Sequence, residues 1–473
     1  MTKHLDIDTK AMRAKILDLA IRGKLTDQRQ EDGNARDLLK EIQAEKERLI
    51  KEKKIKKEKP LPEITEEEKP FDIPENWEWV RLGNIAQAIN GDRGKNYPKR
   101  EEYVSSGIAW INTGHITDDG YLNADKMNYI TRDKYDSLRS GKIQRNDLLF
   151  CLRGSFGKVA RIEPFYEGAI ASSLAIIRLF DTALREYLFI YLKSPQAVNE
   201  LNKYANGTAQ PNLAAKDVLK YLIPLPPLAE QKRIADKVSA LFAQLDAIDK
   251  TYEEYRELQQ TMKSKLLELA IQGKLTDQRQ EDGDARDLLK EIQAEKEKLI
   301  KEKKIKKEKS LPEIEADEIP FEIPTNWMWA RIGDIFTLQS GKSIKANEIS
   351  VKQDDEYRYP CFGGNGIRGY VKAFNREGDY PIIGRQGALC GNINFSSGKF
   401  YATEHAVVTD GYSKVNTYWA VIFLKALNLN QYATATAQPG LSVTKINTVL
   451  IPLPPLAEQK RIVAKLDELL PLL

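Results

Sequence analysis

The chain has 473 residues, of which 41% are hydrophobic and 30% charged, and its formal net charge is +4. This length predicts two or three domains, and the small net charge excludes a protein that binds nucleic acid through bulk charge, so any DNA-binding face must be a local concentration of basic side chains. The cysteines Cys151, Cys361 and Cys390 are widely spaced without a CxxC pair, which argues against a disulfide framework and a structural zinc site and fits a reducing cytoplasm.

The beginning of the chain carries no sign of export. Residues 1–10 lack the apolar segment of a signal peptide, and no run in the sequence approaches the ~20 apolar residues that span a membrane. We therefore expect a cytoplasmic protein with no membrane partner.

A charged segment is the first repeated element. Residues 20–59 recur at 270–309 with three differences. Glu and Lys recur within each copy at helical spacing, which predicts charged helices over about 35–59 and 285–309. Each helix is either a solvated, salt-bridged element or an arm that docks a partner or faces phosphates. Its lysine-rich end, KEKKIKKEK, supplies charge but no means of reading a base sequence.

A second repeat has a different spacing. The stretch IPLPPLAEQKRI occurs at 223–234 and again, letter for letter, at 451–462. Its copies lie 228 residues apart, whereas the charged segments lie 250 apart, so the material between the repeats is 22 residues shorter in the second half. A passive tandem duplication would leave the middles as alike as the ends. Here like ends enclose unlike middles.

This pattern predicts five segments. They are an N-terminal helical segment (1–82), a first variable block (83–222), a central helical segment (223–332), a second variable block (333–450) and a C-terminal helical segment (451–473).

The central segment predicts a long helix over about 230–272. Its apolar residues follow steps of four and three, as in a heptad seam, with Pro227 before the helix and Gly273 after it. The C-terminal segment repeats the start of this seam and the N-terminal segment repeats its end. We expect this split copy to pack antiparallel on the long helix in a cyclic, pseudo-twofold arrangement.

The apolar seam is the predicted spacer and partner-docking element. Its residues are Ile234, Val238, Leu241, Leu245, Ile248, Met262, Leu266 and Leu269 in the central helix, Met12, Ile16 and Leu19 in the N-terminal segment, and Ile462, Leu466 and Leu469 in the C-terminal segment.

Both variable blocks are rich in short strand patterns and glycine-bearing turns, which predicts β-rich domains with a few helices, such as one around 185–204. The expected fold class is therefore α+β, with two β-rich domains separated by long antiparallel helices.

In each block a strand ends in a basic, glycine-bearing turn, at 153–158 and at 385–392. Glycine permits close approach to a phosphate or base edge. An ordinary hairpin turn with an exposed Arg is the alternative.

The candidate DNA-contacting residues lie in these turns and the neighbouring loops, because Arg, Lys, Asn and Gln are the side chains that read base edges. They are Arg93, Lys95, Asn96, Lys99, Asn112, His115, Arg153, Ser155 and Lys158 in the first block, and Lys342, Lys345, Asn365, Arg385, Gln386 and Asn392 in the second. The lone histidine His115, like His405, is more readily a hydrogen-bonded structural residue than a catalyst.

The sequence offers no catalytic motif. It lacks the Asn/Asp-Pro-Pro-aromatic loop of adenine methyltransferases, an HExxH motif, a cysteine–histidine zinc cluster and a GxSxG elbow. The stretch at 340–343 ends like a phosphate loop, but Phe336 stands where the earlier glycine is required. We expect neither catalysis nor a bound metal or cofactor in this chain.

The whole chain resembles the specificity (S) subunit of type I restriction-modification systems, the HsdS family. The resemblance rests on the alternation of repeated ends and unlike middles, on residues 207–234 and 435–462, and on the Pro-x-x-Trp entries at 74–77 and 324–327. It implies two target-recognition domains that each read one half of a bipartite, asymmetric site on double-stranded DNA. It also implies two methyltransferase subunits and restriction subunits as partners, which would use S-adenosylmethionine, ATP and Mg²⁺.

Two other classes of function remain open. A bivalent coiled-coil adaptor that binds proteins through its β-rich domains would show no salt-dependent DNA affinity, whereas a DNA reader would lose affinity steeply as salt rises. A nuclease or methyltransferase with an unrecognised site would cleave or methylate DNA by itself.

Overall fold

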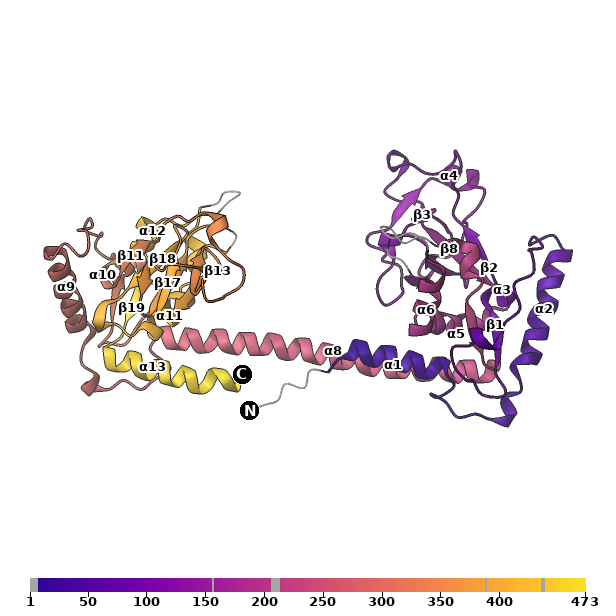
Figure 1. Cartoon of the computed structure of the whole chain (residues 1–473), viewed down its shortest axis with the longest axis horizontal. Coiled ribbons are helices and arrows are strands. Elements are labelled where there is room, and N and C mark those ends of the chain that lie inside the picture. Colours follow the sequence, from indigo (N-terminus) through magenta and orange to yellow (C-terminus); the bar gives the residue numbers. More distant parts are fainter. Residues whose placement is uncertain (1–6, 155–156, 206–212, 388, 435–438) are drawn as a thin grey trace. The chain divides into compact units, whose positions relative to one another are not determined.

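The computed structural model describes residues 7–154, 157–205, 213–387, 389–434 and 439–473. It divides into two compact units that meet in the sequence between Tyr252 and Glu253. Each unit combines helices with small sheets (Figure 1), so the α+β class predicted from the sequence is confirmed.

The first unit contains one variable block and the helices around it. Its helices are α1 (Thr9–Ile21), α2 (Ala35–Lys51), α3 (Leu82–Ile85), α4 (Arg132–Ser137), α5 (Arg185–Leu192), α6 (Pro195–Tyr204), α7 (Ala215–Val218) and the first half of α8 (Leu228–Ile271). Its strands are β1 (Glu78–Arg81), β2 (Ala86–Asn90), β3 (Ile108–Ile111), β4 (Asn128–Ile130), β5 (Leu148–Cys151), β6 (Val159–Arg161), β7 (Gly168–Ile170), β8 (Leu174–Leu179) and β9 (Leu222–Leu225).

Helix α1 packs antiparallel on the first half of α8. Thr9, at the start of α1, donates a hydrogen bond of 2.7 Å to Asp249, and Arg13 donates one of 2.9 Å to the same carboxylate. Thr26, beyond the end of α1, reaches Glu230 near the start of α8 at 3.0 Å. Residue numbers rise along one helix as they fall along the other, which confirms the predicted pairing of the N-terminal segment with the long helix.

The charged helix is shorter than the sequence predicts. We expected it over 35–59, but α2 ends at Lys51, because Lys53 adopts a left-handed conformation (φ 58°) and its N–H binds the carbonyl of Ile50 at 3.0 Å. Such a residue ends a helix by turning the chain away from the axis. The second copy, α9, ends in the same way, with Lys303 at φ 58°.

Two short helices replace the single helix expected around 185–204. Helix α5 ends at Leu192, and α6 begins with Pro195, whose missing N–H is tolerated only in the first turn of a helix. The hydroxyl of Ser194 accepts the N–H of Ala197 and caps this new start.

The first variable block is built on two sheets. The four-stranded sheet has the antiparallel order β2-β8-β5-β6, and the three-stranded sheet has the order β4-β3-β7, with β3 and β7 parallel. Strands β1 and β9 form a separate antiparallel pair at the two ends of the block. The ends of the block are therefore tied to each other, as for a domain inserted between two helical segments.

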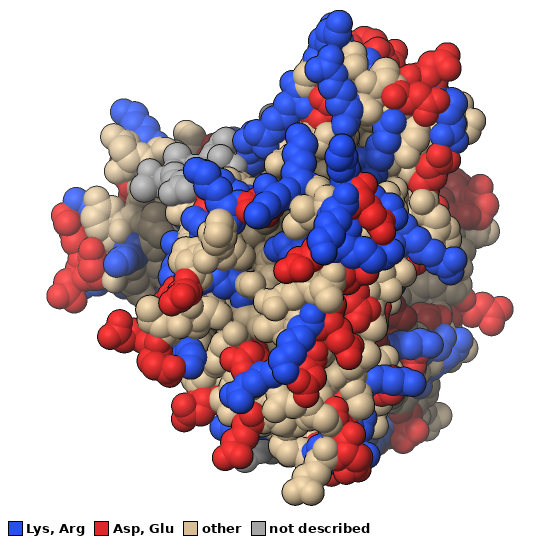
Figure 2. Space-filling view, turned by 90° about the vertical axis from the view of Figure 1, so that its right-hand side faces the viewer, with Lys and Arg blue, Asp and Glu red and all other residues tan. Residues whose placement is uncertain are grey.

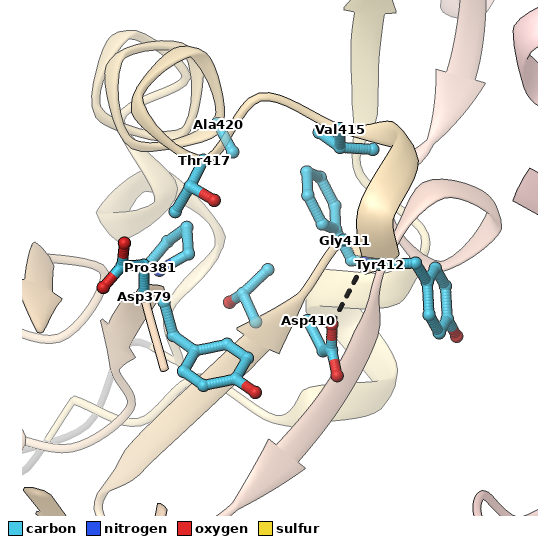
Figure 3. Close-up of a pocket in the computed structure, with 11 residues that line it drawn as sticks. Asp379, Pro381, Asp410, Gly411, Tyr412, Val415, Thr417 and Ala420 are labelled. Atoms are coloured by element: carbon cyan, nitrogen blue, oxygen red, sulfur yellow. Dashed lines mark hydrogen bonds between the residues drawn. The ribbon is translucent and has the colours of Figure 1, made fainter. Parts of the chain in front are cut away.

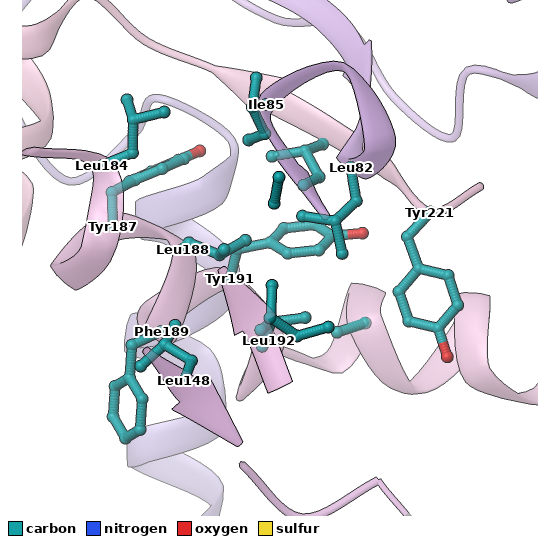
Figure 4. Packing of buried hydrophobic residues seen from close by; sticks show 14 of the residues in the cluster. Leu82, Ile85, Leu148, Leu184, Tyr187, Leu188, Phe189, Tyr191, Leu192 and Tyr221 are labelled. Carbon is teal, nitrogen blue, oxygen red and sulfur yellow. The ribbon is translucent and has the colours of Figure 1, made fainter. Parts of the chain in front are cut away.

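Helix α5 joins the block to this strand pair through a buried apolar cluster (Figure 4). The hydroxyls of Tyr187 and Tyr191 donate hydrogen bonds to the carbonyls of Pro224 and Leu222 in β9. Burial raises the pKa of both tyrosines well above the usual value, so the hydroxyls stay protonated donors.

The second unit repeats this plan with a different block. Its helices are the second half of α8, α9 (Ala285–Lys301), α10 (Ile332–Ile335), α11 (Thr417–Ala426), α12 (Val443–Asn447) and α13 (Leu456–Leu469). Its strands are β10 (Met328–Arg331), β11 (Thr337–Ser340), β12 (Tyr359–Gly363), β13 (Gly366–Val371), β14 (Arg376–Glu377), β15 (Tyr380–Gly384), β16 (Ile393–Ser396), β17 (Lys399–Ala402), β18 (Ala406–Asp410) and β19 (Leu450–Leu453).

The two variable blocks share a topology despite their unlike sequences. The second block has the sheets β11-β18-β15-β16 and β13-β12-β17-β14, with β12 and β17 parallel, and β10 pairs with β19 outside them. Strand for strand this is the order of the first block, with β14 added. Within the second unit, α13 and the second half of α8 share a core cluster.

Candidate functional site

Most residues of the predicted seam are buried or half-buried within their unit. Its buried members are Ile234, Val238, Leu245, Ile462 and Leu466, its half-buried members are Leu241, Leu266, Leu269, Ile16, Leu19 and Leu469, and its exposed members are Ile248, Met262 and Met12. The seam thus packs the helices of each unit at its ends and leaves apolar side chains exposed near the middle of α8.

Each unit has a joint where the Pro-x-x-Trp entry meets the repeated IPLPPLAEQKRI stretch. In the first unit, Trp77 donates its indole N–H to Glu230 Oε2 at 2.8 Å. The other oxygen of Glu230 accepts Thr26 and Gln28 at 3.0 and 2.7 Å. Glu230 is fully buried, so this carboxylate is satisfied by three donors from the N-terminal segment and the block entry.

The joint of the second unit has the same bonds. Trp327 donates to Glu458 Oε2 at 2.7 Å, and Thr276 and Gln278 reach its other oxygen at 2.9 and 2.8 Å. The repeated sequences therefore form the same joint in both units, although the blocks that they hold differ.

The two basic turns predicted from the sequence occupy the same place in the two blocks. The N–H of Cys151 binds the carbonyl of Lys158 at 2.8 Å, and the N–H of Gly384 binds that of Asn392 at 2.9 Å. Both turns thus close the end of the matching hairpin, β5–β6 in one block and β15–β16 in the other.

The two arginines of these turns do not match. The N–H of Leu152 binds the carbonyl of Ser173 at 2.9 Å, and the N–H of Arg385 binds that of His405 at 3.0 Å. Arg385 therefore stands where the first block has the buried Leu152. The side chain of Arg385 is half-buried and donates to Ser340 Oγ at 3.2 Å.

Arg153 and Gln386 are the matched, exposed residues of the two turns. They stand one position beyond Leu152 and Arg385, and a glycine with positive φ follows each of them. The sequence pairs Arg153 with Arg385, but the hydrogen-bond register pairs it with Gln386. Arg and Gln prefer different base edges, guanine for Arg and adenine for Gln.

A glycine at the end of the first strand of each block approaches the backbone of a neighbouring loop. A Cβ at Gly91 would lie 2.5 Å from the carbonyl oxygen of Ile170, and one at Gly341 would lie 1.9 Å from that of Ala402. No other residue fits there without moving the backbone. This close approach brings the loop after β2 or β11 against the loop that precedes β8 or β18.

The loop at 91–100 is held in shape by its own polar groups. Asp92 accepts the N–H groups of Gly94 and Arg139 at 2.7 and 2.8 Å, and these bonds hold its pKa below the usual value. Asn96 donates its amide to the carbonyl of Ser137 at 2.7 Å. Asn96 is thus engaged in loop packing, whereas the other candidates here, Arg93, Lys95 and Lys99, are exposed.

The turn after β3 lies beside the first basic turn. A Cβ at Gly154 would lie 3.5 Å from Thr113 Oγ1. Asn112 caps this turn by accepting the N–H of Gly114 at 2.8 Å, and His115 Nδ1 accepts the N–H of Asn112 at 3.1 Å. His115 is buried, which lowers its pKa. Its ring supports the turn and is not on the exposed face with the other candidates.

Lys158 and Asn392 are the last residues of the two turns. Lys158 is half-buried and pairs with Asp118 at 2.5 Å, whereas Asn392 is exposed. Ser155, the remaining candidate of the first turn, lies outside the described residues.

The second block carries a groove that the sequence did not reveal. Its volume is about 720 Å³, and Lys345, Tyr357, Lys372 and Tyr401 are among the residues that line it. Lysines and tyrosines combine charge for phosphates with flat faces for stacking. Glu348 also lines the groove, and Lys372 pairs with Glu356. Among the predicted candidates, Lys345 lies in this groove, Lys342 is exposed just before it, and Asn365 is exposed in the β12–β13 turn.

The first block brings one further basic residue into contact with the loop at 91–100, and two more follow it in the sequence. Arg139, Lys142 and Arg145 follow α4, and Arg139 is adjacent to the residues that fix this loop because its N–H binds Asp92. These three basic residues recur at every third position, a pattern that is visible in the sequence. Figure 2 shows Lys and Arg gathered over the upper part of the first unit.

A smaller pocket of about 230 Å³ lies in the second unit beside α11 (Figure 3). Its lining includes the carboxylates of Asp379 and Asp410, and Asp410 accepts the N–H of Tyr412 at 3.0 Å. Two carboxylates repel phosphate groups, so this pocket is a poor DNA contact.

Neither a cluster of metal-binding side chains nor a membrane-spanning helix is found among the described residues. Among them, no group of three or more His, Cys, Asp and Glu side chains could hold a metal ion, and no helix is long and apolar enough to cross a membrane. Burial raises the pKa of the Cys151 thiol to about 12 and that of Cys361 to about 11. Such thiols are protonated at neutral pH and poor nucleophiles.

Comparison with known proteins gives one family. The model of the type I restriction modification DNA specificity domain matches residues 74–256 and 324–471. The chain is 29% identical to the specificity subunit of the type I restriction enzyme EcoAI of Escherichia coli, over 98% of this chain and 89% of that protein. It is 31% identical to the EcoEI specificity subunit of the same species, over 69% of this chain and 61% of that protein.

A chain from a solved structure described as a type I R-M system covers 84% of this chain and 91% of its own length, with a TM-score of 0.57 and 22% identity, which shows a shared fold. The two matches of the family model cover both variable blocks. This chain therefore belongs to the family of type I restriction-modification specificity subunits.

Proposed function

We propose that this chain is the DNA-recognition subunit of a type I restriction-modification assembly, in which each variable block reads one half of a bipartite, asymmetric target. The observation that carries this proposal is the contrast between the joints and the turns. The joints at Glu230 and Glu458 are alike bond for bond, whereas the matched turn positions hold Arg153 and Gln386. Two readers on one frame suit a target with two different halves.

The identical frames also suit a partner that binds twice. Two copies of one methyltransferase subunit would meet the same helical surface in each unit, and restriction subunits would join the larger assembly. Adenine methylation with S-adenosylmethionine and cleavage driven by ATP and Mg²⁺ would belong to those partners, so this chain would be non-catalytic. Such an assembly would work on DNA in the cytoplasm.

Long-read sequencing of adenine methylation in the native host tests the proposal. The host with the gene intact is compared with a host that lacks it. One two-part motif with a fixed gap should lose its methylation on deletion. If a host with active partner subunits shows no changed motif, the proposal fails, and the bivalent adaptor becomes the better account. An adaptor would then be expected to retain protein partners and to show no salt-dependent DNA affinity.

A further inference from the structure

The same lysine-rich stretch follows the charged helix of each unit. Residues 51–59 and 301–309, here named the lysine turns, both read KEKKIKKEK, with six lysines and two glutamates. All their lysines are exposed, and only Ile55 and Ile305 are half-buried. Each turn begins where a left-handed lysine ends the helix, so the lysines beyond it lie outside regular structure.

Each lysine turn is fixed at both ends to the root of its variable block. Before the turn, Lys46 donates to the carbonyl of Gly83 at 2.7 Å. After it, the buried Arg81 donates to the carbonyls of Pro62 and Glu63 at 2.7 and 3.1 Å. Arg81 ends β1 and Gly83 lies in α3, and these elements lead directly into β2 and the loop at 91–100.

The second unit holds its lysine turn by the same bonds. Lys296 donates to the carbonyl of Gly333 at 2.7 Å, and Arg331 donates to those of Pro312 and Glu313 at 2.8 Å each. A charge held by the root of the block keeps a set position relative to the reading loops of that unit.

The composition of the lysine turns fits a phosphate backbone better than a protein surface. Protein interfaces have apolar or aromatic centres and are depleted in lysine, and these turns offer one half-buried isoleucine each. A lysine ammonium is a point charge suited to phosphate contacts, which carry no sequence information. Because the two turns are identical, they cannot distinguish two different half-sites.

We propose that the lysine turns bind DNA phosphates beside the half-site that the same unit reads, as a sequence-independent clamp; this inference rests on the proposed function. Figure 2 views the first unit from the side on which α2 lies, where Lys and Arg gather toward the upper part of the unit. The clamp supplies affinity, and the turns and loops of the block supply specificity.

The test uses the full-length chain in the assembly from which it is purified. Lys56, Lys57 and Lys59 are replaced by glutamine in one variant, and Lys306, Lys307 and Lys309 in another. Matched controls carry arginine at the same positions, which keeps the charge. Binding to a duplex with the motif mapped by methylation sequencing, and to a scrambled duplex of the same length, is measured from low to high salt.

The glutamine variants should lose affinity for both duplexes by the same factor. The slope of log K against log salt should become shallower by about 0.9 for each lost phosphate contact, and the arginine variants should keep it. Unchanged affinity and slope would overturn the clamp. So would loss of bound subunits with unchanged DNA affinity, which would make the turns a protein-docking surface. A wild-type chain that does not prefer the motif would instead contradict the proposed function.

Discussion

Trp77 donates its indole N–H to the buried carboxylate of Glu230 at 2.8 Å, across 153 residues of sequence. This bond joins the entry of the first variable block to the helix that leaves it. Trp327 and Glu458 make the same bond at 2.7 Å in the second unit. The joint explains why the stretch IPLPPLAEQKRI is repeated without change: its glutamate must meet a fixed set of donors wherever a block begins and ends.

Replacing Glu230 with alanine should destabilise the first unit by about 3 kcal/mol, because the donors of Trp77, Thr26 and Gln28 would lose a shared buried acceptor. Chemical denaturation with hydrogen exchange resolved by unit would measure this loss. The control is D236A, an exposed carboxylate on the same helix, which should leave stability nearly unchanged. If the two substitutions lower stability equally, the bonds of Glu230 do not stabilise the first unit.

Acid should weaken the first unit through Asp32. Its side chain is 3% exposed and bonds Arg233 at 2.6 Å, and this hydrogen bond lowers its pKa from the ordinary 3.8. Because the folded-state pKa is the lower one, the stabilisation is complete above the unfolded-state value and is lost as pH falls through the folded-state value. The stability gap between wild type and D32N should therefore narrow below about pH 4. A D27N control, at an exposed carboxylate nearby, should leave stability at neutral pH nearly unchanged.

Replacing Gly91 or Gly341 with alanine should disturb only the block that contains it. The new methyl group would meet a backbone carbonyl oxygen at 2.5 or 1.9 Å, and such overpacking costs about 1–3 kcal/mol. Binding to the matching half-site should fall as the adjoining loops shift. G94A lies in the same loop as Gly91 and meets only the side chain of Asp92 at 3.2 Å. If G94A and G91A behave alike, the close approach is not what the block requires.

The matched turn residues should control one half-site each. Arg153→Ala should weaken recognition of one half of the motif and Gln386→Ala that of the other, by about tenfold, because a good side chain–base pair contributes about 1–3 kcal/mol of discrimination. Duplexes altered in one half at a time would measure this. Arg385→Ala should also affect only its own half, since Arg385 supports the second turn through Ser340. Equal loss at both halves, or no loss, would remove these residues from the reading surface.

The groove at Lys345 and Lys372 provides a further check on the second block. K345Q and K372Q should weaken DNA binding and reduce its salt dependence if the groove faces the duplex. D379N, in the separate acidic pocket, serves as the control and should leave binding unchanged. If D379N weakens DNA binding more than the lysine substitutions do, the acidic pocket rather than the groove faces the duplex.

The sequence by itself determined the repeated helical segments that enclose the variable blocks. Letter-for-letter repeats marked the segments that form the two joints, although not their contacts. The heptad steps located α8 to within two residues at its start and one at its end, because a helix of that length displays its buried face as a period in the sequence. The same local signals placed the two basic turns, since a glycine that ends a strand limits what can follow.

Only the tertiary structure decided how the unlike blocks correspond. Their shared strand order and the match of Arg153 with Gln386 rest on hydrogen bonds between strands distant in sequence, which no local pattern records. The structure also shows that His115 is buried inside its block and that Lys345, Tyr357 and Lys372 line one groove. Helix periodicity is a property of neighbouring residues, whereas the register of a sheet and the lining of a groove depend on which distant segments meet.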